Sequence, residues 1–127
     1  MAQKILVVDD EAKSLNLIVA LLKARGYEVS TASNGKEALR KVQAETPDLM
    51  IVDLMLPEID GWGIAKRLKT DARYQHIPLI MLSALVAEDA PKEALEQGDC
   101  FMGKPFDADK LLATVREFLE KAQPGST

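Results

Sequence analysis

The amino-acid sequence predicts an α/β domain with a parallel β-sheet between two layers of helices. Three short apolar runs, at residues 5–8, 49–52 and 79–82, lack alternating polar residues, which is typical of strands buried on both faces. Amphipathic stretches with helical spacing separate these runs. Strands that alternate with helices predict parallel pairing and helices on both faces of the sheet. A length of 127 residues suits one compact domain.

Two weaker strands complete the predicted sheet. Residues 27–31 alternate and contain β-branched side chains, so we expect this strand nearer an edge of the sheet. Residues 100–102 form a short fifth strand. The predicted order along the chain is therefore a strand followed by a helix, repeated five times.

The helices are predicted from apolar positions with helical spacing. These positions are Leu15, Ile18, Val19 and Leu22 in the first helix, Ala38, Leu39 and Val42 in the second, Ile64, Ala65 and Leu68 in the third, and Leu111, Leu112, Val115, Phe118 and Leu119 in the fifth. A short fourth helix is expected around residues 91–97. Arg25 and Gly26 predict the end of the first helix, and Asp107 is the expected N-cap of the fifth. We expect one domain at 1–122 and a linker-like tail at 123–127.

Charge and composition exclude several classes of protein. The net charge of -4 argues against nucleic-acid binding by this domain, because phosphate contacts need a basic face. No apolar run approaches the roughly 20 residues of a membrane span, and the N-terminus has no signal-peptide layout. A single cysteine, Cys100, and a single histidine, His76, argue against a structural zinc site. We therefore expect a cytoplasmic domain.

Polar residues follow four of the predicted strands at the point where each strand ends. Asp9 and Asp10 follow the first strand, Asp53 the third, Ser83 the fourth, and Lys104 comes shortly after the fifth. The carboxyl ends of parallel strands share one edge of the sheet, where ligands bind in such folds. Each residue alone has an ordinary explanation: a helix cap, a turn residue or a surface lysine. Together they predict one pocket.

The chemistry of this pocket favours a metal ion and phosphoryl transfer. Three carboxylates close together repel one another, so either some take up protons or a cation joins them. Oxygen ligands favour a hard ion such as Mg²⁺. Asp53 could act as a ligand, a base or a nucleophile, and a carboxylate nucleophile can accept a phosphoryl group. Mg²⁺ and the Lys104 ammonium could neutralise the phosphoryl oxygens, and Ser83 could donate its hydroxyl to another oxygen.

The chain resembles the receiver domains of response regulators over residues 4–120. The motifs, in order, are Asp9-Asp10, Asp53-Leu-Met-Leu-Pro57 with Asp60-Gly61, Ser83-Ala84 and Lys104-Pro105-Phe106. The resemblance implies a flavodoxin-like sheet of order 2-1-3-4-5. It also implies a stand-alone, chemotaxis-regulator-like receiver, or a receiver joined to an output domain, that serves as a signalling phosphoacceptor and not as an enzyme.

The resemblance assigns roles to individual residues. Asp53 is the implied phosphoacceptor, and Asp9, Asp10, Asp53 and the backbone carbonyl of Met55 are the implied Mg²⁺ ligands. Lys104 would pair with the phosphoryl group, and its bond to Pro105 would be cis.

Signalling in this family implies a switch and two kinds of partner. Ser83 would be the switch hydroxyl and Phe101 the switch aromatic, acting on the face formed by the fourth helix, the fifth strand and the fifth helix. A histidine kinase or phosphotransfer protein would supply the phosphoryl group. A downstream protein or output domain would read the switch, and a phosphorylation-dependent dimer is compatible with this scheme.

Two features depart from the common family pattern. The segment between Gly98 and Phe101 is one residue shorter than usual, so we expect a different path for this loop. Met55 and Leu85 are apolar where relatives often carry polar residues that help to position a hydrolytic water. We therefore expect slow autodephosphorylation.

Three other functions compete with the phosphorylation switch. A haloacid-dehalogenase-type phosphatase needs a second aspartate where Met55 stands. A flavodoxin-like cofactor binder needs a Ser/Thr/Gly-rich phosphate loop, where this chain has Asp9, Asp10 and Glu11. A receiver that binds partners without phosphorylation would be expected to have lost Asp53, Lys104 or the acidic pair, and all are present.

Overall fold

The computed structural model describes residues 2–54, 61–83, 100–104 and 106–122. Its five parallel strands have the order β2-β1-β3-β4-β5, which confirms the predicted fold class and strand order. The strands are β1 (Lys4–Val8), β2 (Glu28–Ala32), β3 (Leu49–Asp53), β4 (Leu79–Ser83) and β5 (Cys100–Gly103). The helices are α1 (Ala12–Ala24), α2 (Gly35–Ala44), α3 (Gly61–Lys69) and α5 (Ala108–Ala122). The fourth helix predicted around 91–97 lies outside the described residues.

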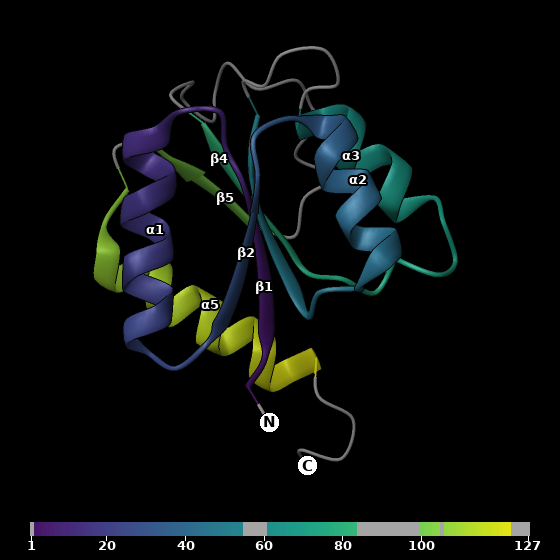
Figure 1. Ribbon diagram of the computed structural model, residues 1–127. Coiled ribbons are helices and arrows are strands. Elements are labelled where there is room, and N and C mark those ends of the chain that lie inside the picture. The colour runs from purple at the N-terminus through teal and green to yellow at the C-terminus, as the bar shows by residue number, and fades with distance from the viewer. Residues whose placement is uncertain (1, 55–60, 84–99, 105, 123–127) are drawn as a thin grey trace.

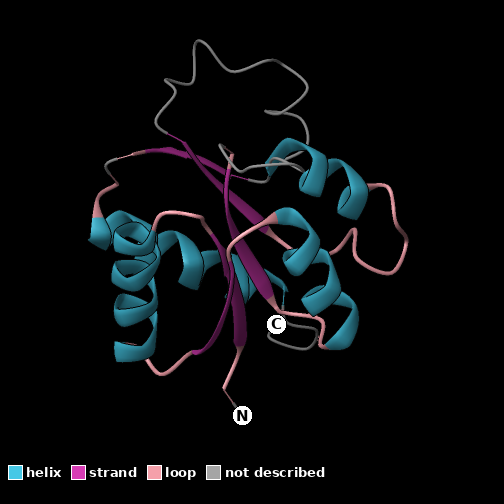
Figure 2. Ribbon diagram, turned by 45° about the horizontal axis from the view of Figure 1, so that its top comes forward, coloured by secondary structure: helices cyan, strands magenta, loops and turns pink. Residues whose placement is uncertain are grey.

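Two helical layers cover the sheet, with α1 and α5 on one face and α2 and α3 on the other (Figure 1). Figure 2 shows the twisted sheet passing between these layers. Alternate residues of each central strand enter different cores: Ile5 and Val7 pack with α1 and α5, whereas Leu6 and Val8 pack with α2 and α3. The uninterrupted apolar runs therefore reflect burial on both faces. No helix in the described ranges has both the length and the apolar character needed to cross a membrane.

The helix ends follow local signals in the sequence. Gly26, at φ 87°, donates its N–H to the Lys23 carbonyl at 3.0 Å, and the Tyr27 N–H reaches the Leu22 carbonyl at 3.3 Å. This pair of bonds ends α1 in a Schellman motif. Asp107 caps α5 as predicted, because its Oδ1 accepts from the backbone N–H groups of Asp109 and Lys110 at 2.9 and 3.2 Å.

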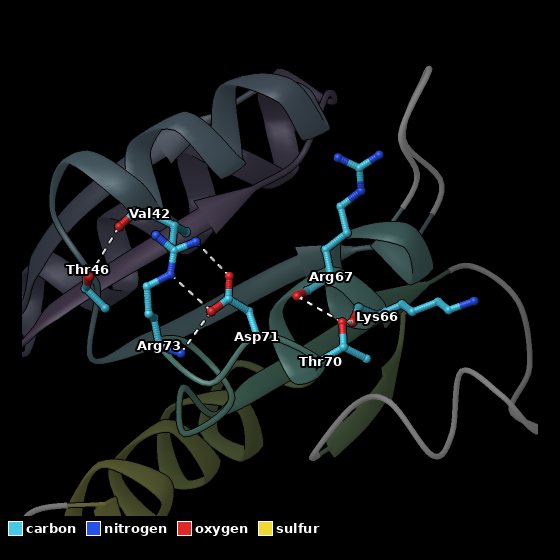
Figure 3. Close-up of polar contacts among 7 residues, drawn as sticks. All are labelled: Val42, Thr46, Lys66, Arg67, Thr70, Asp71 and Arg73. Carbon is cyan, nitrogen blue, oxygen red and sulfur yellow. Dashed lines mark hydrogen bonds and ion pairs between the residues drawn. The ribbon is translucent and has the colours of Figure 1, made fainter.

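The turn between α3 and β4 is held by side-chain contacts (Figure 3). Thr70 Oγ1 donates to the Lys66 carbonyl at 2.7 Å, which closes the last turn of α3. The Asp71 carboxylate then accepts from the backbone N–H of Arg73 at 2.9 Å and from its guanidinium at 2.8 and 3.1 Å. The Arg73 guanidinium also stacks over the Tyr74 ring, with 4.9 Å between its carbon and the ring centroid. These contacts hold the first residues of the connection from α3 to β4.

Candidate functional site

The carboxyl ends of the strands place charged residues from three parts of the sequence at one edge of the sheet. Asp9 directly follows β1, Asp53 is the last residue of β3, and Lys104 directly follows β5. Asp9 and Asp53 are 1% and 6% exposed, and they are the only charged or polar residues that are fully buried in the described part of the chain. Carboxylates are rarely buried without a partner.

That partner is the ammonium of Lys104. Its Nζ donates to Asp9 Oδ2 at 2.7 Å and to Asp53 Oδ2 at 3.0 Å. Because β5 is the far edge strand, its lysine reaches across the end of β4 to contact the two acids. The Lys104 side chain is only 15% exposed, so water screens these contacts weakly.

Asp9 is fixed by its backbone and by its carboxylate. Its N–H donates to the Ala32 carbonyl of β2 at 3.1 Å, and its Oδ1 accepts the Glu11 N–H at 2.9 Å. The second bond is an Asx turn, in which Asp holds the N–H two residues ahead. The possible role of Asp9 or Asp10 as helix cap is wrong, because the N-cap of α1 is Glu11 and it makes no side-chain cap.

Burial and charge act in opposite directions in this site. Burial, together with the negative charge of Asp53, raises the pKa of the Asp9 carboxyl, although the hydrogen bonds from Lys104 and the Glu11 amide and the charge of Lys104 lower that pKa. Burial lowers the pKa of the Lys104 ammonium, but the hydrogen bonds to Asp9 and Asp53 overcome this effect and raise the pKa above its ordinary value. Lys104 is therefore a cation at neutral pH, and it contacts both Asp9 and Asp53.

Three carboxylates at this edge fit a hard divalent cation. Asp9, Asp10 and Asp53 each offer an oxygen, and the three oxygens lie within 4.8 Å of one another. Two oxygens bound to one Mg²⁺ at about 2.1 Å lie at most about 4.2 Å apart, so small side-chain shifts suffice to bring all three onto one ion. Asp10 is exposed, which leaves the water-facing side open for the water ligands that Mg²⁺ usually keeps.

Four of the predicted site residues lie together in the structure: Asp9, Asp10, Asp53 and Lys104. Other predicted residues lie outside the described part of the chain or have side chains that are not described. Ser83 ends β4 in register with Gly103, but its side chain is not described. Met55, Leu85, Pro105 and residues 98–99, at the start of the segment expected to be one residue short, lie outside the described residues. Phe101, the predicted switch aromatic, is half-buried and packs against the α2/α3 core.

One contributor to the site was missed by sequence reasoning. The backbone N–H of Glu11 orients Asp9, yet Glu11 was considered only as part of the acidic loop. The available signal was the Asx turn, since an aspartate at a strand end commonly holds the N–H two residues ahead.

Comparison with known proteins identifies the class of domain to which this fold and site belong. Residues 5–116 match the family model of the response regulator receiver domain. The alkaline phosphatase synthesis transcriptional regulatory protein PhoP of Bacillus subtilis is 40% identical over 97% of this chain and 51% of its own length. The Francisella response regulator 1452 receiver domain superposes with a TM-score of 0.87 at 30% identity, covering 95% of this chain and 99% of that one.

A chemotaxis response regulator, CheY4 of Vibrio cholerae, superposes with a TM-score of 0.86 at 29% identity over 93% of this chain and 99% of that one. The fold is thus that of the receiver domains of two-component response regulators. The chain belongs to the response regulator receiver domain family, which confirms the resemblance inferred from its motifs. The chain spans about half the length of several curated relatives that it matches, PhoP among them.

Proposed function

We propose that this domain accepts a phosphoryl group on Asp53 from a histidine kinase or phosphotransfer protein. The observation that supports this most strongly is the Lys104 ammonium, which bridges the buried Asp9 and Asp53 carboxylates at the carboxyl edge of the sheet. The metal ligands proposed for Mg²⁺ are Asp9, Asp10, Asp53 and the backbone carbonyl of Met55. Such an ion supplies positive charge to the transferring phosphoryl oxygens.

Asp53 is positioned as the nucleophile. A carboxylate oxygen of Asp53 forms a bond to phosphorus, while the bond from phosphorus to the donor nitrogen breaks and its electron pair stays with the donor histidine. Asp53 ends a strand in which every residue is buried, so the surrounding packing holds its backbone in place for this exchange. The product is an acyl phosphate on Asp53.

Lys104 acts before and after the transfer. Its ammonium holds the Asp53 carboxylate at 3.0 Å and compensates part of the charge that the acids accumulate in a buried pocket. The phosphoryl group brings roughly two negative charges, so the ammonium then pairs with a phosphoryl oxygen. The Ser83 hydroxyl moves toward the phosphoryl group and donates to another of its oxygens. This movement of Ser83 is coupled to a change in the packing of Phe101.

Phosphorylation in this proposal changes the conformation of the face formed by β5, α5 and the predicted fourth helix. Phe101 on β5 changes its packing as Ser83 moves, and this shifts the population of conformations on that face. A downstream protein or an output domain reads the change, and a phosphorylation-dependent dimer is one form of readout. We propose residues 1–122 as the receiver unit, 123–127 as the start of a linker, and the cytoplasm as the compartment.

The deciding experiment is phosphorylation by acetyl phosphate, with the intact mass as the readout. The wild-type protein should gain one phosphoryl group only when Mg²⁺ is present, and Asp53→Asn should gain none. Beryllofluoride should also change the fluorescence of Trp62, the single tryptophan. Failure of both responses would contradict the proposal and favour the alternative, a receiver-like module that binds partners without phosphorylation.

A further inference from the structure

The outer edge of β2 carries backbone groups that face away from the sheet. β2 ends the sheet and pairs only with β1. The Glu28 N–H donates to the Gln3 carbonyl at 2.9 Å, and the Ala32 carbonyl accepts from Asp9. Because alternate residues of a strand face the same neighbour, Val29 and Thr31 direct their N–H and C=O groups outward.

Lys41 of α2 occupies one of these outward groups. Its Nζ donates to the Thr31 carbonyl and forms an ion pair with Glu37 Oε1 at 3.4 Å. Glu37 is held in turn, because its Oε2 accepts from Ser33 Oγ at 3.3 Å and its N–H donates to Asn34 Oδ1 at 2.8 Å. This chain of contacts fixes a lysine over the edge of the strand, a position known to discourage strand addition.

The rest of the edge is open. A cavity of about 710 Å³ lies along β2 between the C-terminal ends of α1 and α2. Its lining includes Lys23, Tyr27, Val29, Ser30, Lys41 and Glu45. The helices therefore leave room beside the strand, and the contact from Lys41 is what occupies the Thr31 carbonyl.

We propose that the edge of β2 is a pairing strand for a second copy of this chain and that Lys41 keeps it closed. In an antiparallel pair with its two-fold axis at Ser30, Val29 of each copy faces Thr31 of the other. Each Val29 N–H then donates to the Thr31 carbonyl of the other copy, which is the acceptor that Lys41 occupies.

The side chains of this register suit a second copy. Ser30 lies opposite Ser30 of the second copy, and Glu28 lies opposite Ala32, so no like charges face each other directly. The cavity lining carries both lysines and glutamates, and a two-fold interface requires one patch to complement itself.

The test is the self-association of Lys41→Met, measured by sedimentation equilibrium in Mg²⁺-free buffer. The variant keeps the aliphatic stem but loses the donor, and we expect its dimer dissociation constant to fall at least tenfold below that of the wild type. Lys41→Arg retains a donor and should behave as wild type. Lys23→Met removes the same charge from the same cavity and should also remain unchanged.

A second substitution locates the contact. Adding Val29→Pro to Lys41→Met removes an outward N–H that the monomer does not use, and proline is tolerated at such an edge position. We expect the double variant to be monomeric, with the far-UV circular dichroism of the folded domain. In ¹⁵N spectra of the dimer, the Val29 amide should exchange with solvent more slowly than in the monomer.

Three results would overturn the proposal. The first is a folded Lys41→Met that associates no more strongly than wild type. The second is a dimer that persists with Val29→Pro or that forms equally in Lys23→Met, which would place the contact elsewhere. The third is a monomeric Lys41→Met that binds a synthetic peptide of residues 27–33, since the edge would then accept a strand but not a whole domain.

Discussion

Lys104 Nζ and Asp9 Oδ2 lie 2.7 Å apart, although the two residues are separated by 95 positions in the sequence. The same nitrogen lies 3.0 Å from Asp53 Oδ2. One ammonium therefore serves as counter-ion to two buried carboxylates that, in the proposed function, receive a phosphoryl group and a metal ion. A cation in this position should assist phosphoryl transfer and oppose the binding of another cation.

Lys104→Met should separate these two effects. Removing a charge next to the acids should tighten Mg²⁺ binding by at least about fivefold, because a unit charge about 4 Å away contributes roughly 1 kcal/mol even in bulk water and more where screening is weak. Phosphorylation by acetyl phosphate should instead slow by at least about tenfold, since a counter-charge on the phosphoryl group is lost. Calorimetric Mg²⁺ titration and time-resolved intact mass measure the two effects. Lys110→Met, an exposed lysine on α5, is the control.

Asp9→Asn should weaken Mg²⁺ binding. The substitution keeps the shape of the side chain but removes one of three carboxylates whose oxygens lie within 4.8 Å of one another. We expect a loss of about tenfold in affinity, since charge is the main attraction for a hard ion. Glu28→Gln removes the same charge at the opposite end of the sheet and should change the affinity little; an equal loss there would indicate a general electrostatic effect.

Polar substitution at Met55 or Leu85 should shorten the lifetime of the phosphorylated state. Both positions are apolar in this chain, and we expect a polar side chain two residues after Asp53 or Ser83 to help position a hydrolytic water. After removal of acetyl phosphate, loss of the phosphoryl group from Met55→Asn and Leu85→Glu can be followed by intact mass. A half-life equal to or longer than that of wild type would show that these positions do not limit hydrolysis.

Gly26→Ala should destabilise the domain by about 1–2 kcal/mol. A Cβ at this position meets nothing within 4 Å, so the expected cost comes from the backbone conformation at φ 87° and not from a clash. Gly26→Asn should cost less, because asparagine tolerates the left-handed region. Urea unfolding gives both values, and equal stability of Gly26→Ala and wild type would mean that the end of α1 rearranges.

The contact between Asp71 and Arg73 should be visible in a pH titration (Figure 3). The hydrogen bond from the Arg73 side chain, together with that from its backbone N–H, lowers the pKa of the Asp71 carboxyl below its ordinary value. A carboxyl whose pKa is lower in the folded state stabilises the fold above its unfolded pKa, and this contribution disappears as the pH falls through the folded pKa. Arg73→Ala should raise the pKa of Asp71, measured by NMR of the carboxyl carbon, whereas Arg67→Ala should leave it unchanged.

Sequence patterns located the strands closely, but they placed the end of every strand except β1 one residue too early. Asp53 and Ser83 were expected just after their strands, and each is the last residue of its strand. The strand predicted at 27–31 lies at Glu28–Ala32, and its expected place at an edge is confirmed. Apolar runs indicate burial, whereas strand ends depend on backbone pairing, which can continue into a polar residue.

The sequence by itself determined the alternation of strands and helices, the burial of the central strands on both faces, and the edge where the polar residues gather. These features follow from local periodicity, which a reader of one sequence can see. The tertiary structure decided that Asp9 is buried while its neighbour Asp10 is exposed, and that the Lys104 ammonium bridges Asp9 and Asp53. It also decided that Lys41 covers the Thr31 carbonyl. Such choices depend on which strands are neighbours and on how deeply each residue lies, and side chains far apart in sequence come within reach only after the sheet has formed.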